Sequence, residues 1–301
     1  MCWWLRTIKD CPGADPQKDA EVLHKAMKGL GTDEKAIVEL LGNRSNKQRA
    51  PIVTAYKKTY GKDLIKELKS ELNGPLEKLV VAMMMSPANY DAYLVKGTVY
   101  YANECTFLKS HTFHPEHGKS LEDAIKNDTS GDFRNLLVTL CQVAVVRSRC
   151  VISTLLYFHK VFHSVSHKTY VFKYFNYFAC NSCLLYSPQV FQEYMKLSGK
   201  DIEKSICSEM HGNLEHGMVA LVKCIKNIPA FFAEVLNKAI KGTGTSDRTL
   251  IRIMVSRSEI DMLDIRQEYK KNYGKSLYTD IAGDTGGDYE KLLLKLCGGN
   301  D

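Results

Sequence analysis

Apolar side chains recur every three or four positions along residues 19–83, and short polar or glycine-containing turns separate the segments that carry them. This spacing is typical of amphipathic α-helices that bury one face. The sequence therefore predicts five short helices in this part of the chain. Their inward-facing positions are, in helix order, Val22, Leu23, Ala26 and Met27; Ile37, Leu40 and Leu41; Ile52, Val53, Tyr56 and Tyr60; Leu64, Ile65 and Leu68; and Leu76, Leu79, Val80 and Met83.

Polar residues and glycines between these segments predict where the helices begin and end. Ser45 and Gln48 have the S-x-x-Q form of a capping box, which places the start of the third helix after Ser45. Gly61 is expected to end that helix, since glycine tolerates the left-handed conformation of a C-terminal cap. The fourth helix should end before Glu71, and Pro75 should open the fifth, because proline is favoured in the first helical turn.

The same pattern returns near the other end of the chain. The segment K-G-L-G-T at residues 28–32 recurs as K-G-T-G-T at residues 241–245, an offset of 213 residues (242 minus 29). This offset makes Ser258-x-x-Asp261 the counterpart of the capping box in the earlier copy. Since 213 is three times 71, we predict a module of about 70 residues that is repeated four times.

Two chemical features recur inside these outer modules. Glycines two apart bend the backbone so that carbonyl oxygens can converge, and a carboxylate follows 40 residues after the second glycine (71 minus 31, and 284 minus 244). Carbonyl oxygens, one carboxylate and water suit Ca²⁺ better than Mg²⁺ or Zn²⁺. A single G-x-G-T is weak evidence, but its recurrence at the same distance from an acid predicts two calcium sites. The alternative is that the glycines only end helices and that Glu71 and Asp284 are solvated loop acids.

These turns, followed by E/D-x-x-G at residues 71–74 and 284–287, resemble the calcium-site pattern of the annexin family. The resemblance covers residues 5–92 and 189–301, with half a repeat at 119–142. It implies an all-α fold, an annexin-like array of four five-helix repeats, and binding to acidic phospholipid through Ca²⁺. It also implies the metal ligands, which are the backbone carbonyls of Met27, Gly29, Gly31, Ile240, Gly242 and Gly244 and the carboxylates of Glu71 and Asp284.

The two inner repeats match this pattern only in their second halves, so we expect them to be disrupted. Residues 128–131 correspond to residues 284–287 at an offset of 156 (284 minus 128), and residues 209–212 correspond to them at an offset of 75 (284 minus 209). Neither segment has a G-x-G-T turn in front of it. Asp128 and Glu209 are therefore candidate ligands without a partner turn.

The chain is predicted to divide into six parts. They are an N-terminal arm at 1–17, annexin repeat I at 18–87, a partial repeat II at 88–142, an aberrant insert at 143–188, a partial repeat III at 189–228 and annexin repeat IV at 229–301. Residues 95–118, inside the partial repeat II, show neither the glycine turn nor a clear helical period.

The insert at 143–188 contains no aspartate or glutamate, and three interpretations of it compete. A membrane span is disfavoured, because Arg147, Arg149, His159 and Lys160 interrupt each apolar window of the ~18 residues that a span needs. A metal site is conceivable, although Cys180-x-x-Cys183 has no second C-x-x-C to pair with. Its further ligands would be His159, His163 and His167. We favour a non-family insertion, such as a translated intron or a gene-model error.

Composition and charge narrow the function classes. The 301 residues are 45% hydrophobic and 25% charged, which is typical of a soluble globular protein. The formal net charge of +7 favours anionic surfaces, but no basic stripe or readout motif supports nucleic-acid binding. Residues 1–6 lack the apolar run of a signal peptide, so we expect a cytoplasmic protein that is peripheral at membranes when calcium is raised. The chain has no P-loop and no H-E-x-x-H, and we expect no enzymatic activity.

The leading functional hypothesis is calcium-dependent binding to acidic phospholipid membranes as a peripheral membrane protein. Two alternatives stand beside it. One is a calcium-independent helical-repeat scaffold that binds protein partners. The other is a misfolding splice or gene-model variant of an annexin, since the loss of helices from the inner repeats would expose apolar faces.

Overall fold

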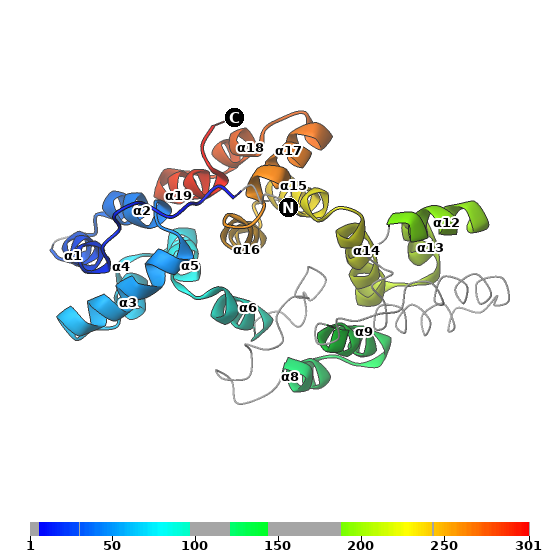
Figure 1. Cartoon of the computed structure of the whole chain (residues 1–301), viewed down its shortest axis with the longest axis horizontal. Helices are drawn as coiled ribbons and strands as arrows, with labels where there is room; N and C mark the ends of the chain where they lie inside the picture. Colours follow the sequence, from blue (N-terminus) through cyan, green and yellow to red (C-terminus); the bar gives the residue numbers. More distant parts are fainter. Residues whose placement is uncertain (1–5, 30, 97–120, 144–187, 243, 301) are drawn as a thin grey trace. The chain divides into compact units, whose positions relative to one another are not determined.

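The computed structural model describes residues 6–29, 31–96, 121–143, 188–242 and 244–300. Every regular element there is an α-helix, which confirms the predicted all-α fold (Figure 1). The chain forms two compact units, one of Met1–Tyr90 with Pro229–Asp301 and one of Asp91–Ile228. The interpretations of the insert at 143–188, including its histidine and cysteine metal site, fall on residues outside the described ranges.

Five helices form the first part of the chain, here called repeat I. They are α1 (Pro16–Met27), α2 (Glu34–Gly42), α3 (Asn46–Tyr60), α4 (Leu64–Glu71) and α5 (Gly74–Met84). Aspartates cap three of them, because Asp15, Asp33 and Asp63 each accept a hydrogen bond from a backbone N–H in the first turn. The predicted capping box of Ser45 and Gln48 is present at the start of α3.

Two details of repeat I differ from the prediction. Glu71 is the last residue of α4 and not, as predicted, the first residue after it. The helix extends this far because the Leu72 N–H donates to the Leu68 carbonyl. Val22 is 41% exposed, since α1 buries the face that carries Ala20, Leu23 and Ala26. Val22 is therefore an apolar residue that lies next to the buried face of α1 but outside the core.

Repeat IV repeats this order of five helices. They are α15 (Ile228–Lys241), α16 (Asp247–Arg257), α17 (Met262–Tyr273), α18 (Leu277–Asp284) and α19 (Gly287–Cys297). The predicted capping box at Ser258 is wrong, because Ser258 is the C-cap of α16 and α17 begins only at Met262. The Asp261 carboxylate instead accepts two hydrogen bonds from the buried guanidinium of Arg257.

The core of the first unit joins repeat I to repeat IV. Helix α2 packs against α19 (Figure 1), and α5 packs against α16. These helices contribute fully buried leucines. Gly42 allows the close approach of α19, since a β-carbon at this position would lie 2.5 Å from Lys295 Cδ. The Lys295 ammonium then pairs with the Glu39 carboxylate at 2.9 Å. The fold of each outer repeat thus depends on the other.

Arg49 is the polar centre of this junction and is 2% exposed. Its Nη1 donates to the Met83 carbonyl at 2.6 Å, and its Nη2 donates to Glu259 Oε1 at 2.9 Å. The same Glu259 oxygen accepts a hydrogen bond from the Asn46 N–H at 2.7 Å. Burial lowers the pKa of Arg49 to about 10, against the attraction of Glu259. One carboxylate of repeat IV therefore holds a buried cation and the first turn of α3 in repeat I.

The N-terminal arm crosses the same junction. The Thr7 N–H and hydroxyl donate to repeat IV, at 2.9 Å to the Ser258 carbonyl and at 2.6 Å to the Leu296 carbonyl respectively. Farther along, Gln48 Oε1 accepts from the Cys11 N–H at 2.9 Å. Residues 6–15 therefore lie along both outer repeats.

A buried tyrosine joins three helices in repeat I. The Tyr56 hydroxyl, on α3, donates to Glu67 Oε2 on α4, and His24 Nδ1 on α1 lies 3.2 Å from the same hydroxyl. Lys62 donates to the other oxygen of the Glu67 carboxylate. Burial disfavours ionised Glu67, but the hydrogen bonds from Lys62 and Tyr56 outweigh it and lower its pKa.

Repeat IV contains a similar arrangement, in which Asn237 and Asp280 stand in the places of His24 and Glu67 and the lysine comes from another position. The Tyr269 hydroxyl donates to Asp280 Oδ2 at 2.7 Å, and the Asn237 amide donates to that hydroxyl at 3.1 Å. Lys241 Nζ donates to Asp280 Oδ1 at 2.8 Å. We call these two sets of residues the tyrosine networks: His24, Tyr56, Lys62 and Glu67 in repeat I, and Asn237, Tyr269, Lys241 and Asp280 in repeat IV.

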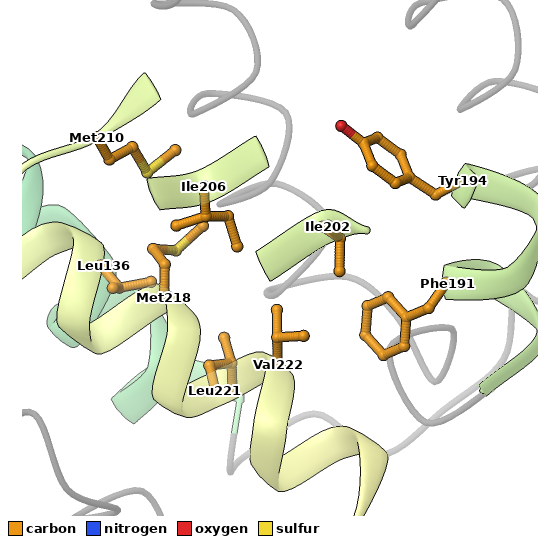
Figure 2. Close-up of a cluster of buried hydrophobic side chains, with 9 residues drawn as sticks. All are labelled: Leu136, Phe191, Tyr194, Ile202, Ile206, Met210, Met218, Leu221 and Val222. Atoms are coloured by element: carbon orange, nitrogen blue, oxygen red, sulfur yellow. The ribbon is translucent and has the colours of Figure 1, made fainter. Parts of the chain in front are cut away.

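The second unit contains the helices of the inner repeats. They are α8 (Leu121–Asp128), α9 (Gly131–Val143), α12 (Pro188–Ser198), α13 (Ile202–Glu209) and α14 (Gly212–Lys226), while α6 (Pro87–Lys96) spans the division between the units. Figure 2 shows the cluster that joins α9, α12, α13 and α14. Its buried members are Leu136, Phe191, Tyr194, Ile202, Ile206, Met210, Met218, Leu221 and Val222.

We expect Glu259→Ala to lower the free energy of unfolding by about 1–3 kcal/mol, because it leaves the buried Arg49 guanidinium without its anionic partner. Glu21→Ala, which removes an exposed carboxylate from α1 in the same unit, should change it by less than about 0.5 kcal/mol. Thermal and chemical unfolding followed by circular dichroism measure both. Equal stabilities of the two variants would contradict the role of Glu259.

The tyrosine network of repeat IV should make stability depend on pH. Burial opposes ionisation of Asp280, but hydrogen bonds from Lys241 and Tyr269 lower its pKa below the ordinary 3.8. Its stabilising contribution is therefore present above pH 3.8 and is lost as the pH falls through the lower folded-state value. The difference in melting temperature between the parent and Asp280→Asn should be largest near pH ~6 and shrink below pH ~4. A difference independent of pH would refute this.

Candidate metal centres

The glycine turn of repeat I lies between α1 and α2. Gly29 and Gly31 have φ angles of +132° and +92°, which residues with a β-carbon rarely adopt. The Asp33 N–H donates to the Ala26 carbonyl at 2.8 Å and closes the turn. Leu30, between the two glycines, is outside the described residues. Met27, the first candidate carbonyl ligand, is the last residue of α1.

The structure brings this turn to the acid that the sequence paired with it. The Thr32 hydroxyl, at the end of the turn, donates to Glu71 Oε2 at 2.6 Å across a separation of 39 residues. Glu71 is the exposed C-terminal residue of α4. The two connections, α1–α2 and α4–α5, thus meet at the surface of the repeat, as the prediction of a shared site requires.

Repeat IV reproduces the arrangement. The Thr245 hydroxyl donates to Asp284 Oδ2 at 2.6 Å, and the Ser246 N–H donates to the Ala239 carbonyl at 2.9 Å. Asp284 is the exposed last residue of α18, and Gly244 has a φ of +100°. Ile240 is the second-last residue of α15, at the position that Met27 has relative to its own turn. The shorter aspartate therefore reaches its turn as glutamate does in repeat I.

The two turns are not identical. Gly242 lacks the left-handed φ of Gly29, and its carbonyl accepts a hydrogen bond from the Gly244 N–H at 2.9 Å. A carbonyl has two lone pairs, so Gly242 can still offer one to a cation. Repeat IV has a further bond at this place, in which the Tyr289 hydroxyl donates to Asp247 Oδ1 at 3.0 Å. Burial and the nearby Asp247 raise the pKa of Tyr289, which keeps it a donor.

Sequence reasoning missed the role of Thr32 and Thr245. Both belong to the repeated G-x-G-T segment and are 213 residues apart (245 minus 32). The signal was therefore present, but the threonine was read as part of the turn and not as the group that contacts the acid. A hydroxyl donating to a carboxylate makes a short, charge-assisted bond, which fixes the acid beside the glycines.

The donor set of each site consists of oxygen atoms. It offers backbone carbonyls from the turn and one exposed carboxylate, which fit a hard cation of variable coordination such as Ca²⁺. Across the described ranges, no group of three or more His, Cys, Asp or Glu side chains is placed to hold a metal ion.

The inner acids have a similar local structure without the turn. Asp128 ends α8 and Glu209 ends α13, and the glycines three residues later have φ angles of +60° and +69°. The corresponding glycines of the outer repeats, Gly74 and Gly287, have +60° and +66°. Within the described residues, neither inner acid receives a hydrogen bond from a threonine hydroxyl as Glu71 does.

Among the described helices, none is long and apolar enough to cross a bilayer.

The annexin family model matches residues 18–83, 110–140, 188–221 and 231–296. Rabbit (Oryctolagus cuniculus) annexin A11 is 52% identical over 314 residues, which are 98% of this chain and 62% of that protein. The chain thus spans less than two thirds of the length of the annexin A11 relatives. Cattle (Bos taurus) annexin A5 is 44% identical over 317 residues, and 98% of each chain is covered.

Solved structures give the same result. The annexin III structure has a TM-score of 0.89 at 39% identity and covers all of both chains. Chicken annexin V has a TM-score of 0.84 at 39% identity, over 99% of this chain and 100% of that one. A calcium-bound annexin (Sm)1 has a TM-score of 0.77 at 28% identity, over 98% of this chain and 93% of that one. The family model matches four segments of the chain, and the relatives match along almost its whole length. This protein therefore belongs to the annexin family.

Proposed function

We propose that this annexin is a peripheral membrane protein that binds acidic phospholipid surfaces through Ca²⁺ held at the glycine turns of repeats I and IV. Calcium-dependent phospholipid binding is the general property of the family. For this chain, one observation carries the proposal: a threonine at the end of each glycine turn bonds at 2.6 Å to an acid 39 residues away. In both outer repeats an acid is thus held beside a glycine turn at the same place in the fold.

The proposed ligands follow from this geometry. The carbonyls of Met27, Gly29 and Gly31 and the carboxylate of Glu71 would hold one ion. The carbonyls of Ile240, Gly242 and Gly244 and the carboxylate of Asp284 would hold the other. Calcium takes six to eight oxygen ligands at about 2.3–2.6 Å, so water and a lipid phosphate oxygen can complete each set. With one protein carboxylate per ion, affinity without lipid should be weak, about 10⁻⁴ to 10⁻³ M.

The remaining parts of the proposal follow from this mode of binding. The partner is the acidic phospholipid surface, and the protein is cytoplasmic until calcium rises. No catalytic step and no nucleic acid are involved. Asp128 and Glu209 contribute little, because each stands without a glycine turn in the sequence before it. The six-part division of the chain, with disrupted inner repeats, is part of the same proposal.

Removing the carboxylates tests the sites directly. Glu71→Ala and Asp284→Ala should each raise the calcium concentration for half-maximal binding to acidic vesicles, because each removes the single charged protein ligand of its site. The double variant should lose most calcium-dependent binding in a sedimentation assay. Asp128→Ala and Glu209→Ala, matched changes at inner acids in the same local structure, should behave like the parent.

These variants also separate the alternatives. A calcium-independent scaffold would sediment equally with and without chelator and would not respond to either outer substitution. If Asp128→Ala matched the effect of Glu71→Ala, the assignment of the sites to the outer repeats would be wrong. A misfolding variant would show no cooperative thermal transition in any of the proteins.

Salt distinguishes coordination from diffuse attraction. A net charge of +7 acts on a membrane through a Debye length of roughly 8 Å at physiological ionic strength, and this attraction weakens as salt rises. Inner-sphere contacts between Ca²⁺, the protein and lipid phosphate are not screened in that way. The calcium-dependent bound fraction should therefore survive an increase from ~0.1 to ~0.3 M NaCl. If it fell as steeply as the fraction bound in chelator, basic charge would be the membrane-binding device.

A further inference from the structure

The tyrosine networks lie one helical turn beneath the two proposed calcium sites. Glu67 precedes Glu71 by four residues on α4 (71 minus 67), and His24 precedes Met27 by three on α1 (27 minus 24). Residues three or four apart share a face of a helix. The network therefore spans the gap between α1 and α4 directly below the place where their ends form the site.

Repeat IV keeps the same spacing with different residues. Asp280 precedes Asp284 by four residues on α18 (284 minus 280), and Asn237 precedes Ile240 by three on α15 (240 minus 237). Tyr269, like Tyr56, has no exposed surface. In both repeats a buried phenol connects the helix that leads into the glycine turn with the helix that ends in the acid.

The direction of the hydrogen bonds gives each tyrosine hydroxyl two partners. Tyr269 donates its proton to Asp280 and accepts one from the Asn237 amide. Tyr56 donates to Glu67, so His24 Nδ1 must carry the proton that points at the Tyr56 oxygen. Burial and the neighbouring carboxylate raise the pKa of both tyrosines, so each remains a protonated donor.

We propose that Tyr56 and Tyr269 are positioning residues for calcium, because they fix the separation of turn and carboxylate at each site without touching the ion. The inference rests on the proposed function of those sites. An ion of this kind needs its oxygen ligands at about 2.3–2.6 Å, and the ligands here stand at the ends of two helices. A rigid ring between those helices, bonded to a carboxylate, keeps their ends from shifting.

Repeat III provides a contrast within the same chain. Tyr194 corresponds to Tyr269 (269 minus 194 is 75) and is also buried. However, Ser205 stands where Asp280 stands in repeat IV (280 minus 205 is 75), and its hydroxyl donates to the Asp201 carbonyl at 3.3 Å. This is the repeat in which Glu209 has no glycine turn. The acid below the site is therefore present where the turn is present, although buried tyrosine occurs in all three repeats.

Tyr56→Phe tests the inference, because it removes one hydroxyl and keeps the ring. It is measured in an Asp284→Ala background, in which repeat I supplies the remaining site, with vesicles of phosphatidylserine and phosphatidylcholine. The calcium concentration for half-maximal binding should rise about tenfold, as expected when a residue that orients a metal ligand is lost. Tyr269→Phe should do the same in a Glu71→Ala background.

Exchanging the backgrounds separates positioning from general loss of stability. In the Glu71→Ala background Tyr56→Phe should leave the calcium midpoint unchanged, because the site that it positions is already disabled. Tyr278→Phe, the same chemical change on α18 at a half-buried residue outside the network, should have no effect in either background.

Each result has a defined consequence. An equal shift of the calcium midpoint in both backgrounds would mean that Tyr56→Phe weakens the fold. An unchanged midpoint in the Asp284→Ala background would mean that the hydroxyl is not needed. Either result overturns the inference. If Tyr56→Phe does not fold, Glu67→Gln takes its place in the test, because it keeps a hydrogen-bond acceptor but removes its charge. This variant should raise the calcium midpoint about threefold. If Glu71→Ala and Asp284→Ala themselves left binding intact, the proposed function would fail first, which is a different outcome.

Discussion

The glycine turn and the acid of each outer repeat come from different connections between helices, and they meet only when α1 and α4, or α15 and α18, are held side by side. This constraint governs the rest of the repeat. Helix α3 packs against both α1 and α4, and its buried tyrosine bonds to a residue of each. Five short amphipathic helices are sufficient for this, because none has to be stable alone and each is buried by its neighbours.

Much of this could be predicted from local patterns. Apolar spacing predicted the helices of repeat I. The identical 40-residue offset of glycine turn and acid predicted that these two would lie together, and the bond from Thr32 to Glu71 brings them there. What failed depended on contacts that the apolar pattern does not specify. Ser258 looked like Ser45, but the neighbouring Asp261 is taken by Arg257, so no capping box forms. Periodicity did not separate Val22 from Leu23, the apolar residue beside it, although only Leu23 faces the core.

Arg44 and Arg257 show why such partners escape sequence reasoning. They are equivalent residues (257 minus 44 is 213), and both pair with an aspartate. In repeat I the aspartate is Asp19 on α1, whereas Phe232 occupies that place in repeat IV and lies 4.7 Å from the Arg257 guanidinium. The acid has moved to Asp261, four residues along the chain. Arginines at equivalent positions are thus neutralised from two different directions. A repeat offset alone predicts the arginine but not its partner.

The contact of Arg49 with Glu259 also determines when the first unit can be completed during synthesis. The two residues are 210 positions apart, and Thr7 reaches Leu296 over 289. A ribosome that adds about 5–20 residues per second needs roughly 10 to 40 s to pass from Arg49 to Glu259. For most of that interval α5 has been synthesised but α16, which covers its apolar face, has not. Nascent repeat I therefore exposes this face to chaperones for longer than it would if its partner were its neighbour in sequence.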